Sequence, residues 1–329
     1  MMDKQSRIFV AGHRGLLGSA LMRTLEARGY REPVTRTHEE LDLADAEGVQ
    51  ALFRQERPEY VFMAAAKVGG IQANSALPAE FIQANLAIQN SVIHAAHLAG
   101  VERLVFFGSN CTYPKDSLQP MREEYLSTGP LEPTSESYAV AKIAGMKMCQ
   151  AYNQQYGSLF IPVIPATLYG PNDDFDSNTS HVLSALLDRY HKTNESGGQK
   201  VVLWGTGEPR REFLYADDMA DACIFLMDLD DEALRRTLDG PGGVINIGSG
   251  RDVPIRKLAE IIGRVVGFQG QTENDTSRPD GAPRKLLDSS RMNGLGWSST
   301  IPLEDGIKKT YEWYLNTEFA GTIEKRLVS

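Results

Sequence analysis

The chain has 329 residues, of which 42% are hydrophobic and 23% charged, and its formal net charge is −9 at pH 7. This is the composition of a globular protein with a large core, and with its acidic balance no basic surface argues for nucleic acid or an anionic membrane as a partner. No apolar stretch reaches the length that spans a membrane, and the N-terminal residues lack the apolar region of a signal peptide, so we expect a cytoplasmic protein. Three widely separated cysteines, Cys111, Cys149 and Cys223, predict neither a metal site nor a disulfide framework.

A glycine-rich loop stands in the first strand–helix unit. Residues 7–11 predict a buried strand, and Gly12, Gly15 and Gly18 follow it before an amphipathic helix. In such a unit the first glycine allows a tight turn, the second lets the backbone approach a pyrophosphate, and the third lets the helix pack on the strand. Because the triplet comes directly after a strand and opens a helix, we interpret it as a dinucleotide-binding loop.

The second predicted strand, residues 33–36, indicates which dinucleotide binds. An acidic residue at the end of this strand would hold the ribose hydroxyls of NAD, but here the strand ends in Arg36, and Arg14 lies in the glycine loop. Two arginines suit the 2′-phosphate of NADP, so we expect NADP(H) as the cofactor. The alternative is that both arginines are ordinary surface charges.

Strands and helices continue to alternate along the first half of the chain. Strands are predicted at 60–66, 103–107 and 160–164, and helices at 46–57, at 80–100 and from Tyr138 onward. This pattern predicts an α/β fold with a doubly wound, parallel, Rossmann-type sheet over residues 1–172. The sequence after Pro171 has more loops, with helices from 181, from 217 and through 255–265 and strands at 201–204 and 244–250. We expect a smaller, loop-rich α/β substrate domain over residues 173–329, with the chain free to cross back between the two.

The residues best suited to catalysis lie between Gly108 and Lys142. Ser109 follows the buried strand 103–107, at the end where ligands bind in open α/β sheets. Tyr138 and Lys142 are four residues apart on a predicted helix, so the phenol and the ammonium share one face. We expect the ammonium to lower the pKa of the phenol, and Ser109 to hold the oxygen with which Tyr138 exchanges a proton. A tyrosine and a lysine at this spacing also occur by chance, and the strand, the serine and the glycine loop together favour a site.

Several short runs carry a family resemblance: Ala-Gly-His-Arg-Gly at 11–15, Ala-Ala-Lys-Val-Gly-Gly-Ile at 65–71, Ser-Asn-Cys-Thr-Tyr-Pro-Lys at 109–115, and the segments 168–173, 178–182, 211–214 and 278–288. Through them, the sequence resembles the extended short-chain dehydrogenase/reductases that act on nucleotide sugars, and among these the GDP-L-fucose synthases. The resemblance implies NADPH-dependent 3,5-epimerisation and 4-reduction of GDP-4-keto-6-deoxy-D-mannose. It also implies a homodimer, which is the most frequent oligomer.

The resemblance assigns roles to individual residues. It makes Ser109, Tyr138 and Lys142 the reductase group, and Cys111 and His181 the pair that epimerises. The implied substrate contacts are Arg189, Trp204, Arg211, Asp280 and Lys285. The implied cofactor contacts are Gly12, His13, Arg14, Gly15, Leu16, Leu17, Gly18, Arg36, Asp42, Ala65, Ala66, Lys142, Pro165, Ala166, Thr167, Leu168 and His181.

Cys111 and His181 are residue types that can move protons on carbon. A 4-keto group acidifies the hydrogens on both neighbouring carbons, so one base and one acid can invert both centres. Cys111 stands two residues after Ser109, and on an extended chain both side chains point to the same side. The alternatives are a small buried filler for Cys111 and a helix-start residue for His181. Their occurrence together with Tyr138 and Lys142 favours catalysis.

Three hypotheses about function stay open. The chain acts on GDP-4-keto-6-deoxy-D-mannose, or it epimerises or reduces another GDP-4-keto-deoxy sugar such as a heptose or a dideoxy sugar. In the third, it is a non-catalytic NADP-binding regulator on the same fold. Asn110, Ser137 and Thr167 depart from the pattern of the family, and Thr167 stands near the expected sugar.

Overall fold

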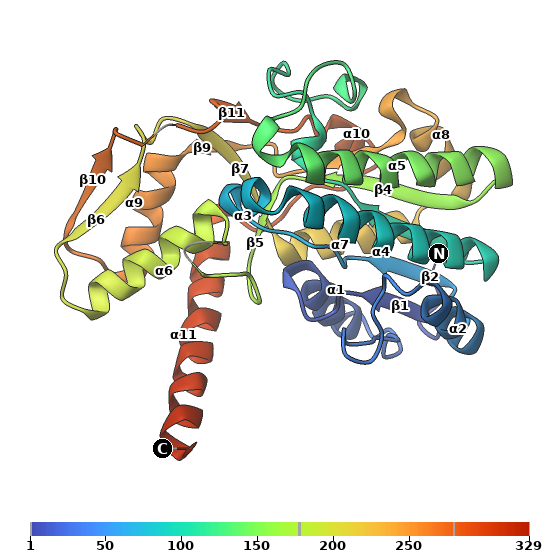
Figure 1. The fold of residues 1–329 in the computed structure, drawn as a ribbon, viewed down its shortest axis with the longest axis horizontal. Helices are drawn as coiled ribbons and strands as arrows, with labels where there is room; N and C mark the ends of the chain where they lie inside the picture. The colour runs from blue at the N-terminus through green and yellow to red at the C-terminus, as the bar shows by residue number, and fades with distance from the viewer. Residues whose placement is uncertain (1, 177–178, 279, 329) are drawn as a thin grey trace.

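The computed structural model describes residues 2–176, 179–278 and 280–328 (Figure 1). Its centre is a five-stranded parallel sheet in the order β1 (Ile8–Ala11), β2 (Tyr60–Met63), β3 (Arg103–Phe107), β4 (Leu159–Pro165) and β8 (Ile245–Ile247). These strands are buried on both faces, which explains why most of them are continuous apolar runs. The predicted α/β fold with a doubly wound parallel sheet is confirmed.

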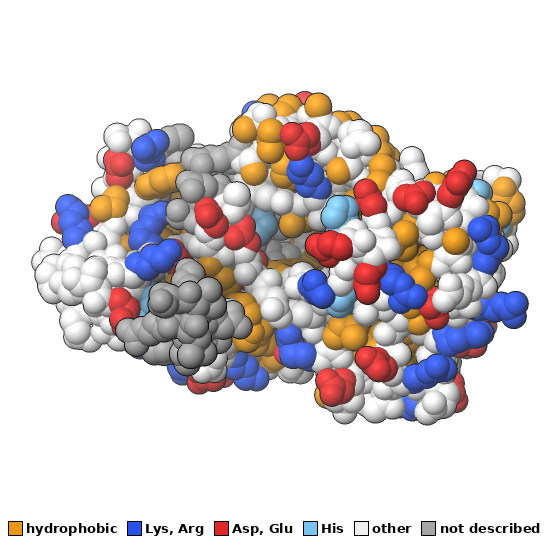
Figure 2. All heavy atoms as spheres, turned by 60° about the horizontal axis from the view of Figure 1, so that its bottom comes forward, with side chains coloured by type: hydrophobic (Ala, Val, Ile, Leu, Met, Phe, Trp, Pro, Cys, Tyr) orange, Lys and Arg blue, Asp and Glu red, His pale blue; other side chains and the backbone are white. Residues whose placement is uncertain are grey.

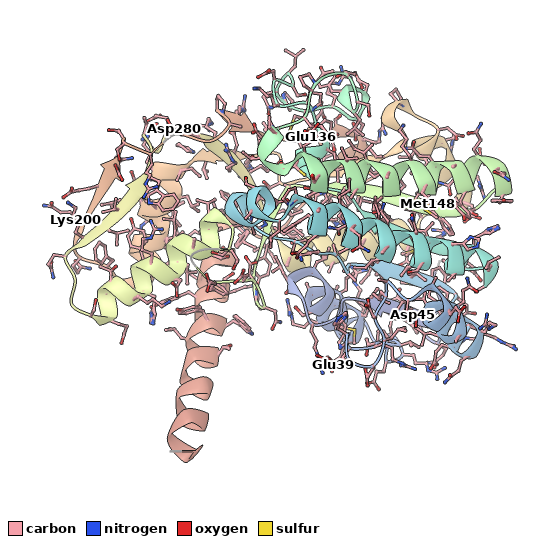
Figure 3. The ribbon with its side chains drawn as sticks, in the orientation of Figure 1. Glu39, Asp45, Glu136, Met148, Lys200 and Asp280 are labelled. Carbon is pink, nitrogen blue, oxygen red and sulfur yellow. The ribbon has the colours of Figure 1, made fainter. Side chains whose placement is uncertain are left out.

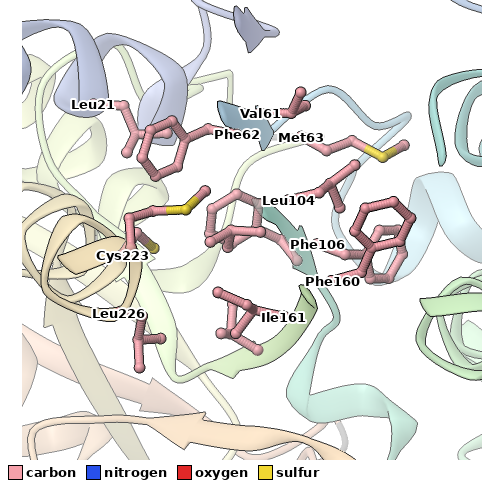
Figure 4. Packing of buried hydrophobic residues seen from close by; sticks show 14 of the residues in the cluster. Leu21, Val61, Phe62, Met63, Leu104, Phe106, Phe160, Ile161, Cys223 and Leu226 are labelled. Atoms are coloured by element: carbon pink, nitrogen blue, oxygen red, sulfur yellow. The ribbon is translucent and has the colours of Figure 1, made fainter. Parts of the chain in front are cut away.

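Helices cover both faces of this sheet. Over one face lie α2 (Ala46–Glu56), α4 (Pro78–Leu98) and α5 (Glu136–Tyr156), and over the other lie α1 (Leu16–Ala27) and α7 (Ala216–Asp228). The close view of the core shows Phe106 and Phe160 on the side of α4 and α5, and Leu21 and Cys223 on the opposite side (Figure 4). Packing on both faces therefore holds the strands in place, including their carboxyl ends, where ligands bind in sheets of this kind.

A second cluster of buried apolar residues lies beside the sheet. It is built by α6 (Val182–Glu195), α9 (Ile255–Val266) and α11 (Leu303–Val328) together with short strands. One small sheet is the parallel pair of β6 (Lys200–Trp204) and β10 (Gln271–Asp275). In the other, β7 (Arg210–Tyr215) lies between β5 (Thr167–Tyr169) and β11 (Arg284–Lys285). The short strand β9 (Asp252–Pro254) pairs antiparallel with β7. Shorter helices are α3 (Ile71–Ala76), α8 (Asp231–Leu238), α10 (Ser290–Gly294) and the 3₁₀ turns η1 (Asn110–Thr112), η2 (Glu123–Tyr125), η3 (Pro133–Ser135) and η4 (Pro241–Gly243).

Most predicted elements are present, and one is much shorter than expected. The predicted strand 33–36 is reduced to a single parallel bridge between Val34 and Phe9. Pro33 has no amide hydrogen to donate to a ladder, so pairing stops there. The chain also crosses back, because β8 and α7 come from residues after 172 and pack on the first sheet. The domain boundary at residue 172 stays a prediction.

Two absences are recorded for the described part of the chain. None of its helices is both long and apolar enough to cross a membrane. In the same residues, no group of three or more His, Cys, Asp or Glu side chains is placed to hold a metal ion. Asn178 and Pro279, which belong to two of the motifs quoted above, lie outside the described residues.

Candidate active site

A cavity of about 1670 Å³ runs past the carboxyl ends of β1 to β4 and on toward β6, β7 and β11. The space-filling view shows a hollow between the two parts of the molecule (Figure 2). Glu39 beside α1 and Asp280 near β6, which both line the cavity, lie far apart in Figure 3. The cavity is large enough for a dinucleotide and a second ligand, since drug-sized pockets measure about 300–1,000 Å³. All of the residues named above as candidate catalytic, cofactor and substrate contacts line it.

The glycine loop forms the floor at one end of this cavity. Gly12 has a positive φ of 80°, and a Cβ on Gly18 would lie 1.9 Å from the carbonyl oxygen of Gly12. Both positions therefore require glycine, and the turn brings the N-terminus of α1 to the cavity. The first amide groups of a helix are unpaired and carry partial positive charge, which favours a phosphate group. The residues present fit the pyrophosphate of a dinucleotide.

The two arginines expected to select NADP lie beside this loop. Arg14 is exposed at the cavity. Arg36 also lines the cavity, but its guanidinium forms an ion pair with Glu56 at 2.7 Å and donates a hydrogen bond to its neighbour's carbonyl, that of Thr35. Arg36 is thus held in place by a carboxylate 20 residues away in sequence.

Ser109, Tyr138 and Lys142 meet where β3 ends and α5 begins. The ring of Tyr138 packs edge-on against Phe81, with ring centroids 6.3 Å apart. The Nζ atom of Lys142 lies 5.8 Å from the centroid of the Tyr138 ring, and only 3% of the lysine is exposed. The four-residue spacing therefore places the ammonium and the phenol on one face of the helix, as predicted.

The direction of the Tyr138 pKa shift is opposite to our expectation. Burial raises the pKa of Tyr138, Cys111 pushes it the same way, and a hydrogen bond with Ser109 only partly opposes them. Burial also lowers the pKa of Lys142 to about 8, although Cys111 acts in the opposite direction. The prediction of a lowered phenol pKa was wrong, because desolvation disfavours the charged phenolate and is the largest effect on this group.

Cys111 does not lie on an extended chain. Ser109 is extended, but residues 110–112 turn into the 3₁₀ helix η1, with Thr112 donating from its hydroxyl to the carbonyl of Ser109 at 2.6 Å. The expectation of an extended chain was therefore wrong, but the side chains of Ser109 and Cys111 still meet, through a hydrogen bond, and both residues line the cavity. Burial raises the pKa of the Cys111 thiol, while Ser109, Lys285 and Lys142 act to lower it.

His181 stands directly before α6 and lines the same cavity as Cys111. The neighbouring Asp173 accepts hydrogen bonds from the hydroxyl of Ser184 and from the backbone of Asp174. Burial raises the pKa of Asp173, and the charge of His181 counteracts this. A carboxylate thus lies close enough to His181 to interact with the charge on its ring.

The far end of the cavity has a flat apolar surface between two cations. Trp204 is 51% exposed at the end of β6. The guanidinium carbons of Arg189 and Arg278 lie 5.8 Å and 5.1 Å from the centre of the indole ring. Next to it, the carboxylate of Asp280 accepts hydrogen bonds from the amide and hydroxyl of Thr206, at 2.9 Å and 2.7 Å. An aromatic face with fixed polar groups around it is suited to stack a heterocyclic base.

Two further cations lie side by side between this surface and the catalytic residues. Arg211 on β7 is in register with Lys285 on β11, and both line the cavity. Within the described residues neither forms an ion pair, whereas their sequence neighbours Arg210 and Arg284 both pair with Asp252. Like charges in register repel each other, so an unpaired couple of this kind favours a bound anion.

Some residues of the cavity were not singled out from the sequence. Glu132 and Asp173 bring carboxylates to it, and Arg278 brings a guanidinium. Arg278 could have been found as part of the 278–288 motif, and Asp173 as the end of the 168–173 motif. Glu132 lies in an irregular segment before η3, and no pattern in the sequence distinguishes it.

A family model described as the NAD dependent epimerase/dehydratase family matches residues 8–248. The chain belongs to this family. Its most similar relatives include "GDP-L-fucose synthase 1" of Arabidopsis thaliana, which is 52% identical over 317 residues, covering 96% of this chain and 95% of the relative. "GDP-L-fucose synthase" of Escherichia coli strain K12 is 50% identical over 317 residues, covering 96% and 98%.

A solved structure of a GDP-sugar reductase has the same fold. "MlghC, GDP-mannoheptose C4 reductase from Campylobacter jejuni with NADP bound" superimposes with a TM-score of 0.86 at 41% identity, covering 96% of this chain and 100% of that one. Because it covers 96% of this chain, the likeness extends over both parts of the molecule.

Proposed function

We propose that the chain converts GDP-4-keto-6-deoxy-D-mannose to GDP-L-fucose by NADPH-dependent 3,5-epimerisation and 4-reduction. The observation that carries this proposal is that two sets of proton-transfer residues, Ser109–Tyr138–Lys142 and Cys111–His181, line one cavity with a dinucleotide loop. The names of relatives that are 50% and 52% identical over nearly their full length support the choice of substrate.

In the reduction, Tyr138 gives a proton to the oxygen of the 4-keto group. Because burial raises the pKa of the phenol, Tyr138 carries its proton at neutral pH and has one to donate. Ser109 holds the same oxygen by a hydrogen bond, and the charge of Lys142 stabilises the phenolate that forms. NADPH, when bound, supplies the hydride for the ring carbon.

In the epimerisation, Cys111 removes a proton from a carbon next to the ketone as a thiolate, and His181 delivers a proton from the other face. The electrons of the broken C–H bond move onto the keto oxygen, where Ser109 and Tyr138 stabilise the enolate. The proton then enters on the opposite side of the carbon, which inverts the centre. Cys111 then gives its proton to the solvent and His181 takes one up, and repeating the steps at the second neighbouring carbon inverts both.

The arginine pair supports NADPH rather than NADH as the reductant. We expect NADPH to bind more tightly than NADH, and Arg36→Ala to weaken NADPH binding by roughly tenfold to 100-fold, because a charged hydrogen bond contributes about 1.5–3 kcal/mol. NADH binding should stay nearly unchanged in the same variant. Dissociation constants for both cofactors check this, with Arg31→Ala, an exposed arginine away from the cavity, as the matched control. Equal affinities of the unmodified protein for the two cofactors would contradict the assignment.

The unpaired couple of Arg211 and Lys285 supports binding of the GDP pyrophosphate. We expect Arg211→Met to raise the dissociation constant of GDP by roughly tenfold to 100-fold, since it removes a charged donor to a phosphate oxygen. Arg210→Met is the matched control, because Arg210 stands next on the same strand but pairs with Asp252. Titration calorimetry with GDP compares the two variants, and a similar loss of affinity in both would place the pyrophosphate elsewhere.

A second candidate is the reduction or epimerisation of another GDP-4-keto sugar. The 41% identity with a GDP-mannoheptose C4 reductase supports it, and so do Asn110 and Thr167, which depart from the family pattern and line the cavity. NADPH oxidation measured with GDP-4-keto-6-deoxy-D-mannose, a GDP-4-keto-heptose and a dideoxy analogue decides between them. The first sugar should give the highest kcat/KM, and a preference for either of the others would overturn the proposal.

We propose that the enzyme is a cytoplasmic homodimer without nucleic-acid or membrane partners. Its three cysteines are free, as expected in a reducing compartment, and Cys111 must stay reduced to act as a base. Acidic and basic side chains are interspersed on the face in Figure 2. The exposed apolar residues Leu98 and Tyr156, on the paired helices α4 and α5, offer a surface to a second copy. Light scattering should give twice the chain mass of 36.3 kDa, and a monomer would contradict the dimer.

A further inference from the structure

The residues between β2 and α3 include a loop, 67–70, that lines the cavity. Its last residue, Gly70, donates its amide hydrogen to the carbonyl of Thr179 at 2.8 Å. Thr179 stands two residues before His181, which directly precedes α6. This hydrogen bond therefore joins the loop that follows a strand of the central sheet to the segment that carries His181.

We propose that the 67–70 loop holds His181 in position for the epimerisation, and that Gly70 and Asn74 are the positioning residues. This inference rests on the proposed function, in which His181 delivers a proton to carbon. It concerns the epimerisation rather than the reduction, because Tyr138 and Lys142 are both carried by α5.

Gly70 is required by what it approaches and not by its backbone conformation. Its φ of −66° and ψ of −179° are available to any residue. A Cβ at this position would lie 3.1 Å from the carbonyl oxygens of both Thr179 and Ser180. Because this is closer than an ordinary van der Waals contact, a side chain would push the two carbonyls back by a few tenths of an ångström.

Asn74, on α3, holds Gly70 in place, and only 7% of this asparagine is exposed. Its side-chain amide donates to the carbonyls of Gly69 and Gly70, at 2.7 Å and 3.1 Å. Its backbone amide also donates to the carbonyl of Gly70, at 3.1 Å. Since carbonyl oxygens only accept, these partners fix the orientation of the side-chain amide. Gly70 is thus held at the N-terminus of α3, where its own amide donates to Thr179.

The start of the loop is fixed to α4. Asn85, which is 2% exposed, accepts from the amide of Lys67 at 3.2 Å and donates to its carbonyl at 2.9 Å. A Cβ on Gly69 would lie 3.1 Å from the ring of Phe81, the ring that packs edge-on against Tyr138. The loop therefore starts on the helix and the ring that support the reductase group, and it ends at the segment that carries the proton donor of the epimerisation. A common support of this kind keeps two sets of reacting groups in register.

The segment of His181 is itself constrained, so a shift at its start reaches the imidazole. The amides of Thr179 and Ser180 both donate to the carbonyl of Asp176, at 3.2 Å and 2.9 Å. The carbonyl of His181 accepts from the amide of Ala185 at 2.9 Å, as the first bond of α6. With a turn on one side and a helix on the other, displacement of the two carbonyls that face Gly70 displaces His181 as well.

Gly70→Ala tests the inference with the smallest side chain. The variant should slow exchange of the C3 and C5 hydrogens with solvent by about threefold to tenfold, because a misplacement of about 1 Å costs about 100-fold and this one is smaller. In a single turnover with NADPH, a larger share of the ketone should be reduced without inversion, while hydride transfer itself stays within about twofold. Asn74→Ala, which releases the loop instead of pushing the segment, should act in the same direction, and it replaces Gly70→Ala if the latter does not fold.

A second measurement needs no substrate. NMR of the full-length protein, with ¹³C in the histidine rings, records the six histidines of the chain, and the signal that is missing from His181→Asn belongs to His181. This signal should move in Gly70→Ala and stay in place in Gly294→Ala. Gly294 is the matched control, because it is exposed at the end of α10 and a Cβ there meets only open space.

An unmoved His181 signal in folded Gly70→Ala and Asn74→Ala proteins would overturn the inference. Equal losses of exchange and of hydride transfer would also overturn it, since the loop would then support the cavity as a whole. Absence of exchange by the unmodified enzyme would instead contradict the proposed function, and the histidine signals would still decide whether the loop holds His181.

Discussion

Replacing Tyr138 by phenylalanine should slow the reduction by about 100-fold to 10,000-fold, which is the usual contribution of a positioned acid. The variant lacks only the hydroxyl group, and the ring that packs edge-on against Phe81 remains, so we expect the fold to be unaffected. NADPH affinity should stay within about twofold, because the phenol acts on the keto oxygen in the transition state rather than on the bound cofactor. Single-turnover oxidation of NADPH, together with cofactor titration, measures both effects.

Tyr152→Phe is the matched control for this substitution. Tyr152 is on the same helix, and its hydroxyl contacts His94 at 2.8 Å, away from the cavity. Its loss should leave the reduction rate unchanged. A near-normal rate in Tyr138→Phe would mean that another group gives the proton, and the assignment of the reductase residues would then fail.

Cys111→Ala should abolish exchange of the C3 and C5 hydrogens with solvent, a loss of at least about 1,000-fold, while direct reduction of the unepimerised ketone continues. Exchange at carbon needs a base next to the ring, and hydride transfer does not. Reduction without inversion would give a different 6-deoxyhexose. Proton NMR of the substrate in deuterated buffer, with NADP⁺ bound to the enzyme, follows the exchange, and product analysis with NADPH follows the reduction.

Cys149→Ala is the matched control, because Cys149 is fully buried on α5 and does not line the cavity. It should exchange both hydrogens at the normal rate after correction for any loss of folded protein. His181→Asn should slow exchange less completely than Cys111→Ala, since water can replace a proton donor more readily than a positioned base. Full-rate exchange in Cys111→Ala would mean that the thiol only fills space and that the base lies elsewhere.

The elements that could be predicted from the sequence are those in which the local order of apolar and polar residues matches the burial of the side chains in the structure. Strand β3 occupies residues 103–107, as expected from a continuous apolar run before Gly108. The glycine loop lies where the spacing predicts it. The positive φ of Gly12 and the lack of room for a Cβ at Gly18 require glycine at both positions. Many residues that line the cavity could be predicted from the short sequence motifs of the family resemblance, because several of these motifs stand at the ends of predicted strands.

The features that could not be predicted depend on contacts between residues far apart in the sequence and on how deeply a side chain is buried. The ion pair of Arg36 with Glu56 joins positions that carry no common pattern. The pKa of Tyr138 is raised because the phenol is buried, and a four-residue spacing on a helix does not reveal burial. The register that sets Lys285 beside Arg211 pairs two short strands from far-apart parts of the chain. Glu132 reaches the cavity from an irregular loop, for which periodicity predicts nothing.

The most direct test of the account is a single turnover of GDP-4-keto-6-deoxy-D-mannose by the unmodified enzyme with NADPH in deuterated buffer. The product is analysed by NMR for configuration and for deuterium at each ring carbon. We predict GDP-L-fucose that carries deuterium at C3 and C5 and hydrogen from the cofactor at C4. A 4-reduced product that keeps its original hydrogens and configuration at C3 and C5 would contradict the account, because the cavity would then contain a reductase without an epimerase.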